Sequence, residues 1–216
     1  MFFISDFSWL TCGQAASILP ELMKSRFSVS VALFAGGVLS AALWNPRVAR
    51  AANLELPFEG EKTTWHEGFE RFDYVMEEDS FAITPFKRPE GEKFAVGNPA
   101  KGQRRCIVVV PKKIATGHPW SWQGCYWDHE PQTEVELLRR GFHVAFITPD
   151  PGKQWDAFYL GLTEKHGLSK EPAFIGMRYE ELGGEIAVII NGNDRRYPLA
   201  TADQSRAVDF IVRKTK

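Results

Sequence analysis

Cysteine and histidine are scarce in this chain. Its 216 residues include three cysteines and five histidines. Neither a C-x-x-C pair nor a His/Cys cluster at zinc spacing is present, so we expect no metal site and no cofactor. Cys106 and Cys125 could pair in an oxidising compartment, but their predicted surroundings differ, and two buried free thiols are the expectation.

An excess of charge of either sign is also lacking. The 26 basic and 27 acidic residues give a formal net charge of -1 at pH 7. Proteins that bind nucleic acid carry a basic field against the phosphate backbone, which this balance does not supply. We therefore expect no nucleic-acid partner. The remaining composition, 44% hydrophobic and 25% charged, is typical of one globular domain.

One long apolar run stands near the start of the chain. Phe27–Trp44 follows two basic residues and precedes Ala49-Arg50-Ala51. A charged start, an apolar middle and a small-x-small end are the layout of a secretory signal peptide, here with a natural start at Met23 and cleavage near Ala51. Export to the periplasm or the cell exterior follows, with membrane contact only in transit. The alternative is an uncleaved anchor, because the run approaches the length that spans a bilayer.

The rest of the chain predicts an α/β domain. After residues 1–51, residues 52–71 are polar and predict an extended arm, and residues 72–216 predict the folded domain. Hydrophobic periodicity predicts strands over 72–76, 80–84, 105–111, 142–147, 172–177 and 185–190 and helices over 131–140, 154–166 and 202–214. The alternation of strands and helices between 105 and 177 predicts a mostly parallel sheet with right-handed crossovers.

The interval between the last two predicted strands is unusual. Residues 178–184 contain a segment, Tyr179–Leu182, that predicts a single helical turn. A crossover between parallel strands needs about a dozen residues, so this interval is too short for one. A sheet that lacks inner strands at this point would expose unpaired edges, and we expect self-association through such edges.

Several segments have sequence motifs, in an order along the chain, that are similar to those of a known family. They are Pro119-Trp120-Ser121-Trp122, Asp128-His129-Glu130-Pro131-Gln132-Thr133, Gly141-Phe142-His143-Val144-Ala145, Leu162 to Ser169, and Gly183-Gly184-Glu185-Ile186 through Tyr197-Pro198. Over about Phe72 to Val212 the chain resembles the α/β-hydrolase superfamily, specifically exported prolyl-oligopeptidase-like or esterase-like serine hydrolases. The resemblance implies a mostly parallel sheet with flanking helices and acyl-enzyme hydrolysis of ester or peptide bonds.

The residues that would perform this chemistry are absent. The family places its nucleophile on a G-x-S-x-G elbow directly after a central strand, and here that position holds Arg178. Arg196 stands where the resemblance implies the base histidine, and the elbow helix and inner strands are missing. A guanidinium offers only donors and cannot attack an acyl group. We therefore predict no catalytic residues in an internally truncated, inactive or nearly inactive hydrolase relative.

A non-catalytic binding module is the second hypothesis, and a product of gene rearrangement, stable only as a partial fold, is the third. In the second, aromatic side chains line a pocket for a small acyl, peptide or carbohydrate ligand, and two arginines fork onto its anionic group. The candidate pocket residues are Trp122, Gln123, Tyr126, Trp127, His129, Asp150, Trp155, Arg178 and Arg196. Core packing is the alternative for the tryptophans, a structural role for His129, and a turn for Asp150.

Overall fold

The computed structural model describes residues 58–92, 97, 99–149, 152–180, 183–191, 193–198 and 201–215, and for 177–180, 183–185 and 201–202 only the backbone path. The predicted signal peptide and the start at Met23 lie outside these ranges. Among the helices that the structure describes, none has the length and apolarity needed to cross a membrane.

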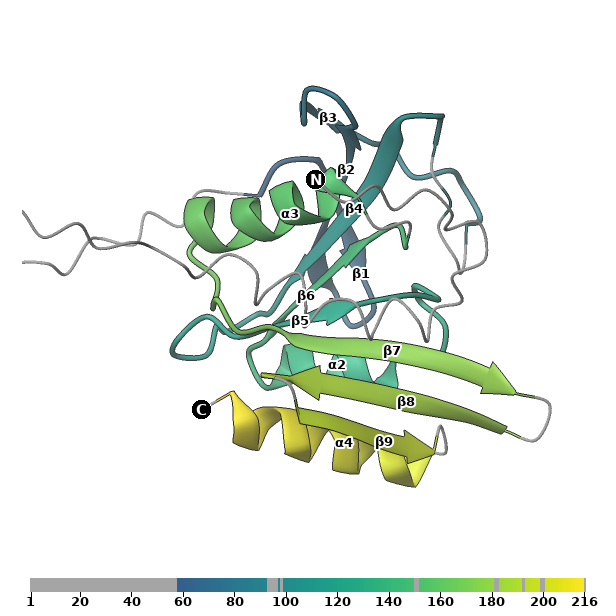
Figure 1. Cartoon of the computed structure of the whole chain (residues 1–216), viewed down its shortest axis with the longest axis vertical. Helices are drawn as coiled ribbons and strands as arrows, with labels where there is room; N and C mark the ends of the chain where they lie inside the picture. Colours follow the sequence, from purple (N-terminus) through teal and green to yellow (C-terminus); the bar gives the residue numbers. More distant parts are fainter. Residues whose placement is uncertain are drawn as a thin grey trace, which may run out of the picture.

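A mixed sheet of nine strands forms the centre of the described fold (Figure 1). The strands are β1 (Glu61–Trp65), β2 (Phe69–Glu77), β3 (Ile83–Pro85), β4 (Gln103–Val110), β5 (Trp120–Gln123), β6 (His143–Ile147), β7 (Ala173–Glu180), β8 (Gly183–Ile190) and β9 (Asn193–Pro198). Their order is β1-β2-β4-β6-β5-β7-β8-β9, and β3 pairs with β2. The general α/β prediction is confirmed.

Only the middle of the sheet is parallel. Strand β5 pairs in parallel with β6 on one side and with β7 on the other. No strand was predicted over the aromatic segment that forms β5, because a four-residue strand shows too little periodicity to be recognised. The predicted parallel relation between 105–111 and 142–147 is wrong, since β4 and β6 pair antiparallel.

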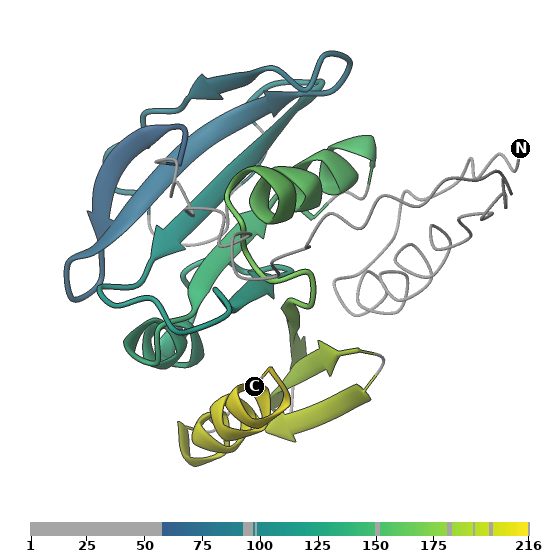
Figure 2. The same ribbon diagram turned by 90° about the vertical axis from the view of Figure 1, so that its left-hand side faces the viewer.

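The helices cover both faces of the sheet (Figures 1 and 2). They are α2 (Gln132–Arg139), α3 (Lys153–Leu160), which continues as the π-helix η1 (Gly161–Lys165), and α4 (Thr201–Lys214). Helix α3 packs on one face, and α2 and α4 pack on the other. The predicted stop of the first helix at Gly141 is confirmed: its φ is +87°, and a Cβ there would lie 2.7 Å from the Lys113 carbonyl oxygen.

The segment after β7 is a hairpin. Arg178 pairs with Glu185 and Glu180 with Gly183, so β7 and β8 run antiparallel, and the predicted helical turn over Tyr179–Leu182 is wrong. The physical reason is the short interval, which can join antiparallel neighbours but not parallel ones. The chain then turns again into β9, where we had predicted only a turn.

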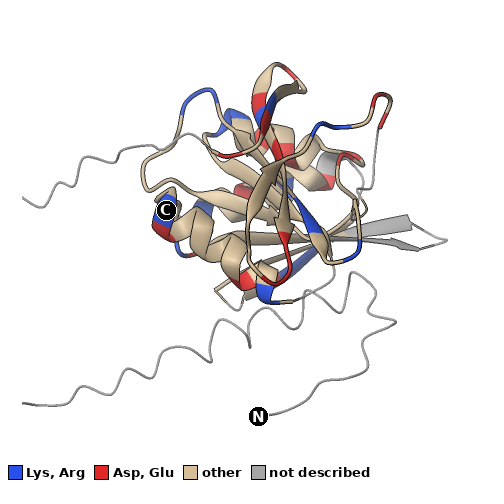
Figure 3. Cartoon of the chain, turned by 90° about the horizontal axis from the view of Figure 1, so that it is seen from above, with Lys and Arg blue, Asp and Glu red and all other residues tan. Residues whose placement is uncertain are grey.

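The ends of the sheet also differ from expectation. Residues 61–71, predicted as part of an arm, form β1 and the start of β2, paired antiparallel. Cys106 is a buried free thiol, whereas Cys125 is disulfide-bonded. The prediction of two free thiols is therefore right for Cys106 and wrong for Cys125. Basic and acidic residues are interspersed along the described chain (Figure 3).

Candidate functional site

Four predicted pocket residues come from one end of the parallel strands. Gln123 ends β5, and Tyr126, Trp127 and His129 lie in the loop that leads to α2. The loop after β6 leaves toward α3 on the opposite face, so β5 and β6 form a topological switch point, where ligands of open α/β sheets bind. Asp150, predicted in the β6 loop, lies outside the described residues.

The loop after β5 has an unusual backbone. Three non-glycine residues adopt positive φ angles, Tyr126 at 51°, Asp128 at 63° and Glu130 at 49°. Such conformations cost about 1 kcal/mol or more each and persist only where surrounding contacts hold them. Here His66 Nε2 lies 2.6 Å from Asp128 Oδ1, and the His129 amide donates to the Tyr126 carbonyl oxygen at 3.1 Å.

A buried carboxyl group lies beneath this loop. Glu134, in the first turn of α2, is 3% exposed. Burial, aided by the charge of Asp128, raises its pKa to about 7, against the smaller opposing effect of its own backbone N–H. Both carboxyl oxygens are enclosed and have no hydrogen-bond partner among the described residues. Glu134 does not line the pocket described below, and we assign it a structural and not a catalytic position.

The predicted tryptophans are core residues on two faces of the sheet. Trp122 and Trp155 pack together under α3, with ring centroids 5.2 Å apart. Trp127 packs on the other face against Trp65, at 5.3 Å. All four are less than 5% exposed. They therefore do not line one pocket, and Tyr126, which is exposed, belongs to neither core cluster.

The two predicted anion-binding arginines lie on strands that do not touch. Arg178 on β7 pairs with Glu185 of β8, whereas Arg196 on β9 pairs with Ala187 of the same strand. The two arginines are thus two strand spacings apart, with β8 between them, and are offset by two residues along the strands. At ordinary strand spacings their Cα atoms lie about 12 Å apart. Arg196 is exposed and lies 3.6 Å from Asp194. The two arginines are therefore not on neighbouring strands, and their joint binding of one anion stays a prediction.

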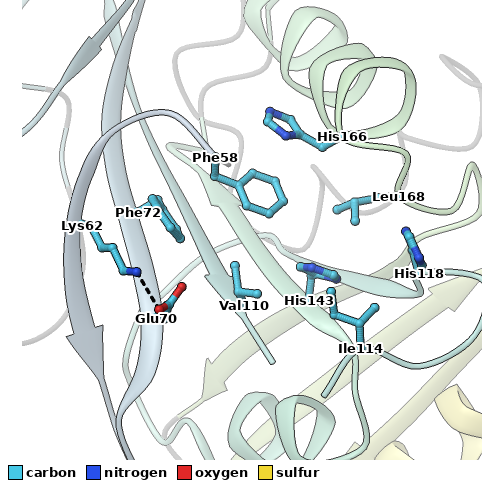
Figure 4. A pocket seen from close by; sticks show the side chains of 10 residues that line it. All are labelled: Phe58, Lys62, Glu70, Phe72, Val110, Ile114, His118, His143, His166 and Leu168. Carbon is cyan, nitrogen blue, oxygen red and sulfur yellow. Dashed lines mark ion pairs between the residues drawn. The ribbon is translucent and has the colours of Figure 1, made fainter. Parts of the chain in front are cut away.

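A pocket opens instead at the opposite, amino ends of β5 and β6 (Figure 4). Its volume is about 270 Å³. Its lining residues are Phe58, Lys62, Glu70, Phe72, Val110, Ile114, His118, His143, His166 and Leu168. We call it the histidine pocket. Figure 4 shows three imidazoles, one from β6, one from the segment before β5 and one from the segment after η1, around a common space.

Packing fixes two of the three imidazoles. The His166 ring stacks on Phe58, with centroids 4.3 Å apart, and its Nε2 lies 3.0 Å from Glu59 Oε2. His143, the first residue of β6, is 2% exposed. Burial lowers its pKa to about 4, the nearby imidazoles of His118 and His166 act in the same direction, and a hydrogen bond to the Pro119 backbone opposes them. His143 is therefore neutral at pH 7.

Sequence reasoning missed this pocket. It singled out His129 and none of the three pocket histidines. One signal was available for two of them, because His118 stands just before β5 and His143 begins β6, and parallel neighbours bring such positions to one edge. Within the part of the chain that the structure describes, no group of three potential ligand side chains could hold a metal ion.

Comparison with known proteins adds no relative. No family model matches the chain, and neither a curated protein nor a solved structure matches it.

Proposed function

We propose that this protein is a non-catalytic, small-molecule-binding relative of the α/β-hydrolases, and that the histidine pocket is its binding site. The lineage rests on the resemblance of the sequence, together with the α/β architecture. The loss of acyl transfer and the location of the pocket rest on separate observations.

The observation that carries the loss of catalysis is the path of β7. Serine hydrolases expose their nucleophile on a sharp turn between a strand and a helix. Here the strand continues through Arg178 to Glu180 and pairs with β8 in a hairpin. The backbone at this position therefore has no elbow, and the residue that would occupy its tip offers no attacking atom.

The first test is chemical. A fluorophosphonate probe should leave the native protein unlabelled, and hydrolysis of p-nitrophenyl acetate should proceed at the rate measured in buffer. Heat-unfolded protein serves as the control for nonspecific labelling. Stoichiometric labelling of one serine, together with loss of ester turnover when that serine is changed to alanine, would show that the protein is a hydrolase.

The second test measures binding. A set of single-ring compounds with neutral, anionic and cationic groups should include members that raise the melting temperature by about 3–6 °C at tenfold their Kd. Ile114→Trp should abolish these shifts, because Ile114 lines the pocket and is only half-buried. The matched control is Lys113→Trp, at the exposed neighbouring position outside the lining. Equal shifts in both variants would contradict binding at this site.

A further inference from the structure

The walls of the histidine pocket are mostly apolar and aromatic. Phe58 lies 5.9 Å from Phe72 and 5.8 Å from His143 between ring centroids, so three rings surround part of the space. Val110, Ile114 and Leu168 complete the apolar lining. A cavity of about 150 Å³ holds benzene in another protein, so about 270 Å³ accommodates one substituted aromatic ring. The volume and the aromatic lining favour an aromatic molecule of this size.

The charges around the pocket cancel. Lys62 and Glu70 form an ion pair at 2.6 Å at the rim, as Figure 4 shows. Glu59 contacts both Lys165 and His166. Because each cationic side chain in this group has a carboxylate partner, an anionic ligand would have to displace one of these carboxylates. The balance of charge therefore favours a neutral ligand.

The buried imidazole of His143 sets the polar requirement. A neutral imidazole has one N–H donor and one acceptor nitrogen. The Pro119 carbonyl oxygen accepts a hydrogen bond from the His143 backbone amide at 3.0 Å, and the Pro119 backbone favours the protonated ring. Nδ1 of His143 has no hydrogen-bond partner among the described residues. Since the neutral ring keeps one acceptor nitrogen, a ligand that donates a hydrogen bond complements it.

We propose that the histidine pocket binds a neutral single-ring aromatic molecule with a hydroxyl donor, that is, a phenol. Its ring packs between Phe58 and the apolar wall, and its hydroxyl donates to the His143 imidazole. This inference rests on the proposed binding function and names its ligand class.

The test compares phenol with two probes of similar shape. Toluene lacks the donor, and benzoate replaces it with a charge. By calorimetry at neutral pH, phenol should bind about five- to tenfold more tightly than toluene, the ratio that one net hydrogen bond provides. Benzoate should bind more weakly than phenol. His143→Phe should reduce the ratio of phenol to toluene affinity to about one. The matched control His129→Phe, in the loop after the carboxyl end of β5, should preserve the ratio.

A measurement on the unmodified protein covers the case in which His143→Phe does not fold. The ¹⁵N resonance of the acceptor nitrogen of His143 should shift upfield on titration with phenol and not with toluene. Equal affinities of phenol and toluene, tightest binding by benzoate, or an unmoved His143 resonance would overturn the phenol assignment. In those cases the proposed binding function still stands if other compounds raise the melting temperature of the protein but not that of Ile114→Trp, and fails if none does.

Discussion

Replacing Glu134 with glutamine should stabilise the protein in a pH-dependent way. The carboxyl group is buried without a partner among the described residues, and burial raises its pKa from 4.5 to about 7. A carboxyl group whose pKa is higher in the folded state contributes stability below pH 4.5 and loses that contribution as the pH rises through 7. Glutamine has no proton to lose, so the variant is spared this loss.

The magnitude follows from proton linkage. With about 1.36 kcal/mol per pKa unit, the wild type should lose about 2.5 kcal/mol relative to Glu134→Gln between about pH 5 and pH 8.5. The comparison of two pH values removes the constant cost of placing an amide in the same site. Urea unfolding of both proteins across this range measures the difference directly.

Glu136→Gln is the matched control on the same helix. Glu136 accepts hydrogen bonds from Arg140 and Arg139, which lower its pKa. As the pH rises, Glu136→Gln should therefore become less stable relative to the wild type, whereas Glu134→Gln becomes more stable. The change for Glu136→Gln should be less than about 1 kcal/mol, as for other exposed ion pairs. The reasoning is refuted if the free-energy difference for Glu134→Gln is independent of pH, or if both variants show the same slope.

Three further predictions concern stability. Because the pKa of His143 is lowered to about 4 in the folded protein, its contribution to stability is present above pH 6.5 and is lost as the pH falls. The free energy of unfolding should therefore decrease by about 3 kcal/mol between pH 7 and pH 4. Acid unfolding of His143→Phe should lack this decrease. Asp73→Asn should lower the free energy of unfolding in urea by about 3–5 kcal/mol, because Asp73 bridges two buried arginines at 2.7–3.0 Å. Glu70→Gln, in an exposed ion pair, should lower it by less than about 1 kcal/mol. Gly141→Ala should lower the free energy of unfolding by at least about 2 kcal/mol, because of the positive φ and the close Lys113 carbonyl oxygen. Gly161→Ala, with open space at its Cβ, should be neutral or stabilising. Equal melting temperatures for the two variants would contradict this account.

Parts of the candidate site were predictable, but the site itself was not. The sequence identified the aromatic segment 120–127, yet it could not place Trp122 and Trp127 on opposite faces, because that depends on recognising β5 as a strand. The sequence also did not show that β8 lies between the strands of Arg178 and Arg196. Export, signal cleavage and self-association through sheet edges remain predictions.

The sequence by itself determined the local features of this protein. Periodicity located α2, α3 and α4 and the buried strands β4 and β6, because periodicity depends on neighbours along the chain. Only the tertiary structure decided the strand order, the hairpin after β7, the burial of Glu134 and the meeting of three histidines from separate segments. These features arise from contacts between residues far apart in the sequence, which pair where the twisted sheet and the two covering layers of helices bring them together.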